Sequence, residues 1–468
     1  MKCDDRQGGE ASQDVDGMQA SRGGHAAVVI LLLHPVTDLV SEAARHRVGD
    51  ARLSRMGEAG EVRDRLVFVT WDGPQQPYLK SLFLPLLRGI ARFGVHSSVL
   101  QFSWGDQPGL DATDLATSLG AIPVEKIEVG RALFPFSYSW SIPSGALALA
   151  KHVRRHRTTL VVARSYLPAA IAFLARRVLP GVPWIFDTDG FMPDERVEFG
   201  GWRENGPMFK LFRRIEAEAV RDAAMVVTRT AAARRTLLLR YPDLREDRSA
   251  SVSNGRDANI FRPASGDERL AARLALGIPG DSLLLVYAGS VGPQYLPEQM
   301  LEFFARVAAI NPSCRLLFLT PAEDLARQAV KRLGRLESSV IIKSVAPLDV
   351  PKWLASADVG LAFRLASVSQ RAVCPLKVAE YLLCGLPVIS SRGIGDLDEQ
   401  LAAAPFARLI SPASQEDSAS AVSFVAALNQ ITLEPLRGAA RDLGLRHYSL
   451  DSVVSAYGRA LGVGSGSS

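Results

Sequence analysis

The stretch CPLKVAEYLLCGLPVI, residues 374–389, decides the fold. Pro375 precedes a short, mostly apolar segment of helical pattern, Cys384-Gly385 ends that segment, and Leu-Pro-Val-Ile follows as a buried strand. Continuously apolar strands that alternate with helices are typical of a parallel sheet covered on both faces. The stretch therefore predicts an α/β fold.

Two charged residues interrupt this otherwise apolar stretch. Lys377 and Glu380 are three residues apart, so they project from one face of the predicted helix. One interpretation is a surface ion pair, worth at most about 0.5 kcal/mol. The other starts from the helix N-terminus, whose free N–H groups and positive dipole end favour a phosphate. Lys377 would then add charge, and Glu380 would reach sugar hydroxyls. The stretch alone leaves both interpretations open.

The same alternation extends along most of the chain in two units. A turn-rich segment, SVSNGRDANIFRPASGDE at 251–268, separates them and is typical of a domain boundary. We expect two Rossmann-like parallel-sheet domains facing a cleft, with a ligand at the carboxyl ends of the strands. The predicted strands are 66–71, 96–102, 158–165, 183–189 and 224–230 in the first unit, and 283–290, 315–320, 339–345, 358–364 and 386–391 in the second.

The expected domain boundaries follow from these units. Residues 1–63 show little periodicity and are expected to be a disordered extension, or the product of an over-long start with Met56 as the true start. The first domain is predicted to span 64–262 and the second 263–440. Residues 441–468 are expected to form a helix returning to the first domain, followed by a tail.

Composition excludes several classes of protein. A chain of 468 residues with 47% hydrophobic and 22% charged residues predicts a globular protein of two domains. Its four cysteines, at 3, 314, 374 and 384, have no CxxC spacing, which argues against zinc and against a disulfide framework. The longest apolar run, residues 26–33, is too short to span a bilayer. We therefore expect a cytoplasmic protein.

Charge is unevenly distributed along the chain. Residues 142–245 hold 18 Lys+Arg against 10 Asp+Glu, while the whole chain carries a formal net charge of +5. Such an excess favours anionic partners such as phosphate groups or acidic lipid. Nucleic acid is not expected, since no zinc finger, RNP-like motif or aromatic-rich basic stripe is present. The basic segment ALALAKHVRRHR at 146–157 is either a solvated helix face or a peripheral contact with an anionic membrane surface.

Four motifs, in this order and spacing, carry a family resemblance. They are FDTDGFMPDERVEFGGW at 186–202, followed by a helix with Glu216, then SNGRD at 253–257, YAGSVGPQY at 287–295 and PLKVAEYLLCGLPVI at 375–389. Together they resemble a GT-B glycosyltransferase of family 4, in particular the bacterial enzymes of capsule and exopolysaccharide assembly. The resemblance implies transfer of a sugar from a nucleotide-sugar donor to a glycan or lipid-linked acceptor, with retained anomeric configuration. It implies no metal and no cofactor.

The resemblance also implies roles for individual residues. Glu380 would bond the ribose of the donor, and Lys377 and Arg371 would neutralise the leaving nucleoside diphosphate. Glycines in the turn at 289–292 would let the backbone approach the diphosphate. The expected donor-binding residues are Gly289, Ser290, Gly292, Tyr295, Arg364, Pro375 and Glu380. The expected acceptor-side residues are Arg164, Asp194, Glu195 and Arg196.

Two positions depart from the family pattern. Many members carry a second carboxylate eight residues before Glu380, where this chain has Ala372. Many also carry an Arg and a Lys just after the glycine turn, where this chain has Pro293 and Gln294. A subgroup with the turn GS-x-G-x-x-Y shares the second departure, and Tyr295 fits that subgroup.

Three other functions are compatible with parts of the sequence. WIFDTDG at 184–190 is similar to the first motif of haloacid-dehalogenase-type phosphatases, in which Asp187 would be the nucleophile and magnesium the cofactor, with GDLDE at 395–399 as a later acidic motif. Predicted strands before that motif, and Phe191 in place of the usual Thr, argue against it. The second function is that of a non-catalytic nucleotide-sugar-binding protein, and the third is that of a sugar epimerase.

Two further groups of residues are expected to be structural. Asn254, Gly255 and Asp257 are expected to brace the linker between the two domains. The spacing of His96, His152 and His156 suggests no metal-ligand set, and these side chains are expected to be solvated.

Overall fold

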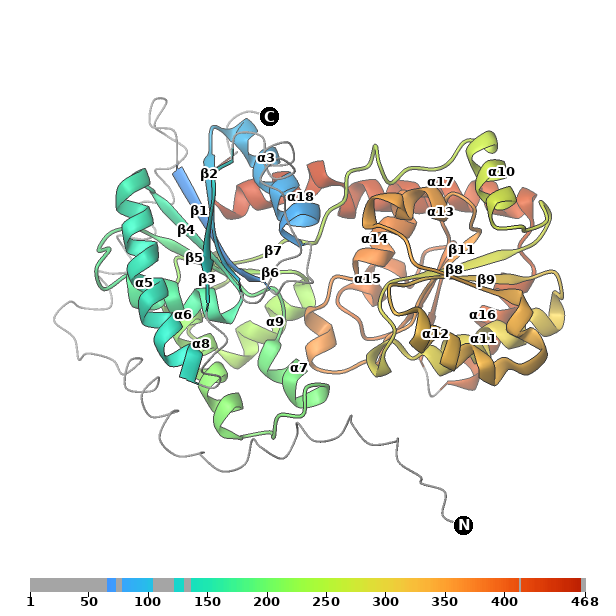
Figure 1. The fold of residues 1–468 in the computed structure, drawn as a ribbon, viewed down its shortest axis with the longest axis horizontal. Coiled ribbons are helices and arrows are strands. Elements are labelled where there is room, and N and C mark those ends of the chain that lie inside the picture. The colour runs from blue at the N-terminus through green and yellow to red at the C-terminus, as the bar shows by residue number, and fades with distance from the viewer. Residues whose placement is uncertain (1–64, 73–77, 104–121, 130–135, 412–413, 464–468) are drawn as a thin grey trace, which may run out of the picture.

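The computed structural model describes residues 65–72, 78–103, 122–129, 136–411 and 414–463. These residues form two α/β bodies, each built on one parallel sheet (Figure 1). The predicted α/β fold class, with two Rossmann-like parallel-sheet domains, is confirmed. The expected extension at 1–63, including Met56, lies outside the described residues.

The first sheet is parallel throughout its seven strands, in the order β3-β2-β1-β4-β5-β6-β7. Its central strands are buried on both faces because successive apolar side chains point to opposite sides. The strands are β1 (Arg65–Asp72), β2 (His96–Ser103), β3 (Val124–Glu128), β4 (Leu160–Arg164), β5 (Trp184–Asp187), β6 (Met225–Thr228) and β7 (Ser249–Ser251).

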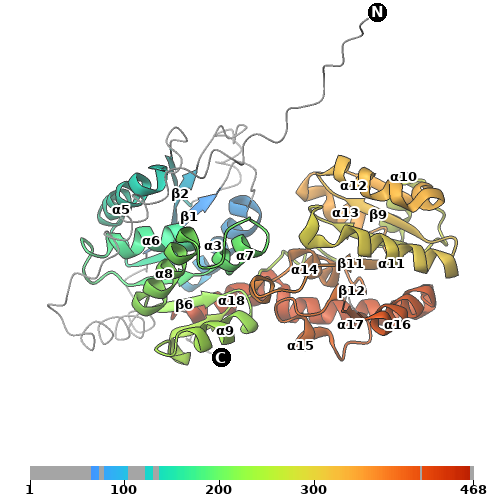
Figure 2. The same cartoon turned by 90° about the horizontal axis from the view of Figure 1, so that it is seen from below.

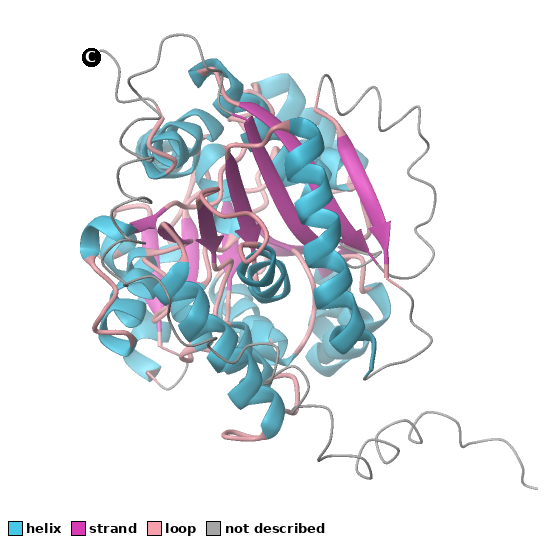
Figure 3. Ribbon diagram, turned by 90° about the vertical axis from the view of Figure 1, so that its left-hand side faces the viewer, coloured by secondary structure: helices cyan, strands magenta, loops and turns pink. Residues whose placement is uncertain are grey.

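Helices cover both faces of this sheet. One face packs against α5 (Phe136–His156), α6 (Tyr166–Ala175) and α8 (Pro207–Asp222). The other packs against the π-helical turn η2 (Leu79–Phe83), α3 (Leu84–Ile90) and a helix from the end of the chain. Figure 3 shows α5, which lies at the left of Figure 1, crossing in front of the strands. The remaining helices are α7 (Met192–Glu198) and α9 (Ala231–Arg240).

The second sheet is also parallel, in the order β10-β9-β8-β11-β12-β13. Its strands are β8 (Leu284–Ala288), β9 (Arg315–Leu319), β10 (Val340–Lys343), β11 (Val359–Ala362), β12 (Val388–Ser391) and β13 (Ala407–Ile410). Its helices are α10 (Gly266–Ala275), α11 (Pro297–Ile310), α12 (Glu323–Val330), α13 (Val350–Leu354), α14 (Leu376–Leu383), α15 (Leu397–Leu401) and α16 (Gln415–Ala426). The opening stretch is therefore α14 followed by β12, as its pattern predicts.

The end of the chain connects the two bodies. Helix α17 (Gln430–Tyr448) packs against α14 of the second body, and α18 (Leu450–Ala460) packs against α3 of the first (Figure 1). The extended residue Ser449 separates the two helices, so the helix expected within residues 441–468 is interrupted at this residue. The packing of α18 is close, because a Cβ placed on Gly89 would lie 2.3 Å from Val454.

Three strands were not predicted from the sequence: β3, β7 and β13. The burial pattern of β3 is mostly exposed, since it is the edge strand of its sheet, and β7 is only three residues long. None of the helices in the described ranges combines the length and apolarity that crossing a bilayer requires.

Candidate active site

The N-terminus of α14 faces the glycine turn that follows β8. Figures 1 and 2 show α14 on the side of the second body that is nearer the first. Lys377, in the first turn of α14, is buried, and its Nζ would lie 3.0 Å from a Cβ placed on Gly289. The sequence thus brings together a lysine and a glycine turn from segments almost ninety residues apart.

Lys377 has no hydrogen-bond partner for its amino group among the described residues. Nζ lies 3.7 Å from the centroid of the Tyr287 ring and 4.9 Å from that of Tyr295. Burial and the nearby Arg364 lower the pKa of Lys377 well below its usual range. A buried ammonium without a partner is unfavourable, so this geometry suits an anion that would complete the site.

Arg364 supplies a second cation beside the first. It follows β11, and its guanidinium lies 4.9 Å from the Tyr295 ring centroid while Nε donates to Gln370 Oε1 at 2.6 Å. Two cations therefore flank one aromatic ring at the carboxyl end of the sheet. Without a bound anion the two cations repel each other, and together they stabilise a bound anion that carries two negative charges.

The turn at 289–292 has a backbone conformation that favours glycine at its first residue. Gly289 has φ of 140°, which side-chain-bearing residues rarely adopt, and a Cβ there would meet Lys377. The Ser290 carbonyl accepts a hydrogen bond of 2.5 Å from Tyr287, and Gly292 precedes a short 3₁₀ turn that ends with Tyr295. Pro375 is the extended N-cap residue of α14.

Glu380 is paired with Arg256 rather than with Lys377. Arg256 Nε donates to Glu380 Oε1 at 2.8 Å, and Arg256 Nη1 donates to the Ser81 carbonyl of η2 at 2.8 Å. Both Lys377 and Glu380 are buried, at 9% exposure, so the interpretation as a solvent-exposed surface pair is wrong. Burial raises the pKa of Glu380, and Arg256 opposes that shift.

Arg371 and Ala372, in the loop between β11 and α14, lie at the boundary between the two bodies. Arg371 is exposed, and its carbonyl accepts a hydrogen bond of 2.6 Å from Thr230. Ala372 is buried in the apolar core of the first body. A carboxylate at that position would be desolvated in these apolar surroundings.

Across the boundary, the carboxyl ends of β1, β4 and β5 gather polar side chains. Arg164 is buried and donates to Asp189, and its guanidinium lies 4.0 Å from the Phe83 ring centroid. Ser165 and Asp189 have positive φ of 70° and 61°. Strained backbone at non-glycine residues concentrates at functional sites, so this edge is the candidate acceptor side of the site.

Asp187 has a structural role that excludes the phosphatase interpretation. Its side chain is fully buried and accepts hydrogen bonds from Arg229, from Arg164 at 3.5 Å and from Tyr457 of α18 at 3.2 Å. Burial alone would raise the pKa of Asp187, but the nearby Arg229 and Arg164 lower it. The carboxylate thus ties α18 to the sheet and is not available as a nucleophile.

The three predicted acceptor-side residues on α7 have different environments. Asp194 is bonded to Arg213 at 2.7 Å and to Arg240 at 3.4 Å, in a network that includes the buried Glu216. Glu195 and Arg196 are exposed, and Glu195 interacts electrostatically with Arg364 of the second body. Glu195 therefore lies near the second body, whereas Asp194 pairs within its own body.

Polar contacts also join the two bodies directly. The Glu198 carboxylate of α7 accepts a hydrogen bond from the backbone N–H of Ser369 at 3.1 Å. The Asp396 carboxylate accepts from Ala231 at 2.7 Å and from Ala232 at 2.8 Å, at the N-terminus of α9. The first contact holds the loop after β11 against the first body, and the second holds the turn between β12 and α15 against it.

Sequence reasoning missed Arg256 and misjudged the histidines. Arg256 lies within the SNGRD motif, where only the flanking residues were expected to act, as a brace of the linker. His152 is buried, so the expectation that it is solvated is wrong, whereas His96 is exposed as expected. The ligand atoms of His152, His156 and Glu125 lie within 4.8 Å of one another. The i,i+4 spacing of the two histidines was the signal for this cluster.

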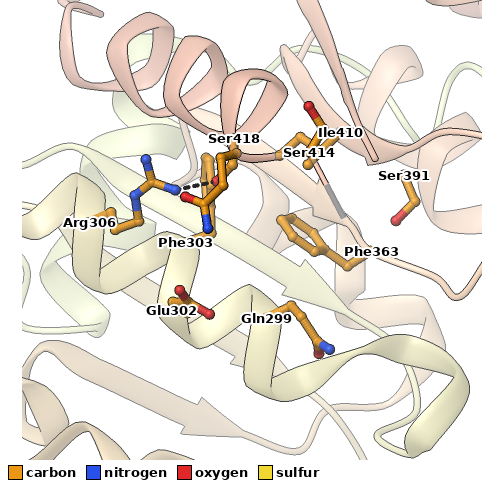
Figure 4. A pocket seen from close by; sticks show the side chains of 10 residues that line it. Gln299, Glu302, Phe303, Arg306, Phe363, Ser391, Ile410, Ser414 and Ser418 are labelled. Carbon is orange, nitrogen blue, oxygen red and sulfur yellow. Dashed lines mark hydrogen bonds between the residues drawn. The ribbon is translucent and has the colours of Figure 1, made fainter. Parts of the chain in front are cut away.

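A separate small cavity lies on the other face of the second sheet (Figure 4). It is lined by residues of α11 and α16, among them Phe303, Arg306 and Ser418, and its volume is about 130 Å³. Ligand pockets for small molecules are usually about 300–1,000 Å³. The cavity is therefore too small for a nucleotide-sugar, and α14 lies on the opposite face.

Comparisons with known proteins agree with this geometry. Residues 82–255 match the family model described as a glycosyl transferase 4-like domain, and residues 283–427 match the model described as glycosyl transferases group 1. Together the two matches cover more than half of the 468 residues. The family resemblance inferred from the four motifs is thus confirmed at the level of the GT-B glycosyltransferases.

Relatives and solved structures support the same assignment. The D-inositol 3-phosphate glycosyltransferase of Saccharomonospora viridis is 26% identical over 364 residues, which are 75% of this chain and 81% of the relative. HepE of Anabaena, solved with UDP and glucose, matches with a TM-score of 0.63 at 16% identity, over 84% of this chain and 98% of that chain. WaaG, a glycosyltransferase involved in lipopolysaccharide biosynthesis, matches with a TM-score of 0.58 at 17% identity, over 86% and 100%. This chain therefore belongs to the GT-B glycosyltransferases.

Proposed function

We propose that the enzyme transfers a sugar from a nucleotide-sugar to a glycan or lipid-linked acceptor, with retention and without a catalytic metal or cofactor. The observation that carries the proposal is the buried, unpartnered Nζ of Lys377 beside the Gly289 turn. A diphosphate in this position would receive the charge of Lys377 and of Arg364. Backbone N–H groups of the turn and of the α14 N-terminus would complete its coordination.

The chemistry requires positive charge at this point. As the bond between the anomeric carbon and the phosphate oxygen breaks, negative charge develops on the leaving nucleoside diphosphate. Preorganised cations in a site that excludes water stabilise that charge more than water does. Lys377 and Arg364 are already held there, and Arg371 lies exposed on the same loop. These three side chains would take the place that a divalent metal has in other transferases.

Glu380 would orient the nucleoside. Arg256 occupies one of its oxygens, Oε1, which leaves Oε2 as an acceptor for ribose hydroxyls. Because the carboxylate is buried, each hydrogen bond to the charged form is stronger than in water.

The acceptor would lie against the carboxyl ends of β4 and β5. Arg164 and Asp189 together offer donors and acceptors for sugar hydroxyls, and Glu195 and Arg196 lie exposed nearby on α7. Relatives suggest which substrates to test first: the HepE structure holds UDP and glucose, and the curated relative is named for D-inositol 3-phosphate. A role in surface polysaccharide assembly is the remaining part of the proposal, supported by the fold shared with WaaG.

We further propose that α5 brings the enzyme to a membrane surface on its cytoplasmic side. One face of α5 exposes Trp140 and Leu147, at 80% and 68% exposure, and continues into the exposed basic residues Lys151, Arg154 and Arg155. Aromatic and apolar side chains beside basic ones are typical of helices that lie in the interface of anionic bilayers.

A donor and acceptor screen tests the proposed reaction. Purified enzyme would be incubated with UDP- and GDP-sugars, with and without each acceptor, and nucleotide release measured beside a Lys377→Ala control. Release that depends on acceptor supports transfer; a changed sugar without transfer would instead establish an epimerase. Product NMR reads the anomeric configuration, and a requirement for added Mg²⁺ or Mn²⁺ would contradict catalysis by the three cationic side chains alone.

A further inference from the structure

Three side chains of metal-ligand type converge at the edge of the first sheet. Glu125 lies on β3, and His152 and His156 lie one turn apart on α5. Their ligand atoms all lie within 4.8 Å of one another. His152 Nδ1 is 2.8 Å from Glu125 Oε2, and the two imidazole rings have centroids 4.4 Å apart. Little movement would place all three around one ion, since zinc–ligand bonds are about 2.0–2.2 Å long.

The Ser98 hydroxyl can form a hydrogen bond with His152 Nε2 whether or not a metal is bound to Nδ1. The Ser98 hydroxyl lies 2.9 Å from His152 Nε2 and 3.3 Å from the Leu66 carbonyl oxygen. Without metal, Nδ1–H donates to Glu125, and Ser98 donates to Nε2. With metal on Nδ1, Nε2–H donates to Ser98, which in turn donates to Leu66. The Ser98 hydroxyl and the His152 imidazole are thus both satisfied in either state. A hydrogen bond from the second imidazole nitrogen is the usual outer support of a metal-bound histidine.

The same hydrogen-bond chain has the order of a Ser-His-acid catalytic triad, but burial excludes that activity. Ser98 is 7% exposed and lies within β2, which pairs with β1 on one side and β3 on the other. A nucleophile enclosed between two strands and a helix is not accessible to a substrate.

From this geometry we propose that Glu125, His152 and His156 form a binding site for a divalent transition metal of the Zn²⁺ class. Two imidazoles and one carboxylate are a ligand set that suits zinc and disfavours Mg²⁺ and Ca²⁺, which take oxygen ligands. Water would complete the tetrahedron. Metal binding would fasten the edge strand β3 to α5, which is a structural role.

The surroundings both favour and oppose a cation. Burial and the neighbouring His152 lower the pKa of His156. Arg65 and Arg155 also lie near His156 and repel a cation, whereas the Glu125 carboxylate attracts one. The site lies near the amino ends of β2 and β3, opposite the end of the sheet that carries Arg164 and Asp189. Its existence is therefore independent of the proposed transfer reaction.

Zinc binding by the full-length protein tests the proposal. Protein freed of metal by EDTA and dialysed would be titrated with ZnCl₂ by calorimetry, and its melting temperature measured with and without Zn²⁺. The variants are His156→Ala and Glu125→Gln, which change partly exposed residues and spare the buried His152. The matched control is His96→Ala, an exposed histidine of the same domain outside the cluster. Histidines 25, 34 and 46 remain in every variant, so zinc bound by them is common to all.

We expect wild type and His96→Ala to bind one zinc ion with equal affinity and to melt at a higher temperature with Zn²⁺. Both cluster variants should bind it more than about tenfold more weakly, because even outer partners of a metal site are worth 10–100-fold. Substitution of Co²⁺ should give the visible absorption of a tetrahedral site in wild type and in His96→Ala. Zinc affinity unchanged by His156→Ala, or no zinc bound by wild type at micromolar concentration, overturns the proposal and leaves an ordinary His152–Glu125 hydrogen bond.

Discussion

Arg256 holds Glu380 through a hydrogen bond of 2.8 Å and holds the Ser81 carbonyl of the other body through a second bond of 2.8 Å. The backbone of Arg256 is fixed as well, because its N–H donates to Tyr448 and its carbonyl accepts from Leu450. One arginine therefore connects the proposed ribose carboxylate, η2 of the first body and the break between α17 and α18. The arrangement of the two bodies and the position of Glu380 are coupled through this residue.

Replacing Glu380 by alanine should weaken donor binding strongly. The variant loses a charge-assisted hydrogen bond to ribose, which is worth about 1.5–3 kcal/mol, or roughly tenfold to a hundredfold in affinity. Calorimetric titration with the nucleoside diphosphate measures the effect, and circular dichroism checks the fold. Glu337→Ala, which removes an exposed carboxylate of the same body, should change nothing. Equal affinities in the two variants would show that Glu380 does not contact the donor.

The affinity for the nucleoside diphosphate should fall as pH rises. In the free enzyme, burial lowers the pKa of Lys377, and a bound diphosphate would raise it again. Binding is therefore strongest below the free-enzyme pKa and weakens as pH rises from that value toward the pKa of the complex. Over this range, binding takes up a proton, which titrations in buffers of different ionisation enthalpy detect.

A Lys377→Arg variant is the control for this pH dependence. Arginine stays protonated at every accessible pH, so the variant should bind without proton uptake even if its affinity is lower. The same pH dependence in both proteins would assign it to another group.

Gly289→Ala should disrupt the diphosphate site without unfolding the protein. Alanine is strained at φ of 140°, and its Cβ would lie 3.0 Å from Lys377 Nζ, so the lysine side chain must move. The expected result is at least about tenfold weaker donor binding with a small change in melting temperature, since backbone strain of this kind is worth about 1–3 kcal/mol. Gly280→Ala is the matched control, because a Cβ at that position meets nothing within 4 Å. Equal donor affinities in the two variants would contradict the turn's role.

Local sequence patterns predict the helices, strands and motifs of this protein, but they do not predict contacts between segments that are distant in the sequence. The helix–strand alternation was predictable because buried parallel strands are continuously apolar. Gly289 and Lys377 could be named as candidate site residues because their motifs are local, and their roles stay predictions. The pairing of Glu380 with Arg256 joins residues 124 positions apart, and no local pattern specifies it. Similarly, β3 escaped prediction because an exposed edge strand such as VEKIE lacks the apolar run of a central strand. With β3 missing, Glu125 had no predicted place beside the two histidines.

Asp187→Asn should destabilise the first body. The substitution leaves Arg229 buried without its negative partner and leaves Arg164 paired with Asp189 alone. Breaking a buried ion pair by removing one partner costs about 3–5 kcal/mol. Because the pKa of Asp187 is lowered in the folded state, its contribution is present above the unfolded-state pKa and is lost as pH falls through the folded-state value. The denaturation midpoint measures both effects. Asp281→Asn, at an exposed position, should leave it unchanged.

Binding to anionic vesicles should depend on the exposed face of α5. Trp140 and Leu147 are exposed on that face, and Lys151 and Arg155 extend it toward the helix C-terminus. Each basic residue near an anionic surface contributes about 1 kcal/mol, and the Debye length is only about 8 Å at physiological ionic strength. The protein should therefore sediment with phosphatidylglycerol vesicles at low salt and largely detach at high salt.

Charge reversal at two separate sites distinguishes a specific contact of α5 with the membrane from general electrostatic attraction. Lys151→Glu with Arg155→Glu should abolish sedimentation at low salt, because the local attraction becomes repulsion. Lys331→Glu with Arg335→Glu makes the same change in net charge on an exposed segment of the second body, and it should sediment nearly as wild type does. If both double variants lose binding equally, net charge alone governs the interaction. If wild type stays in the supernatant at low salt, α5 is a solvated helix face, and the acceptor must reach the enzyme without membrane attachment through this helix.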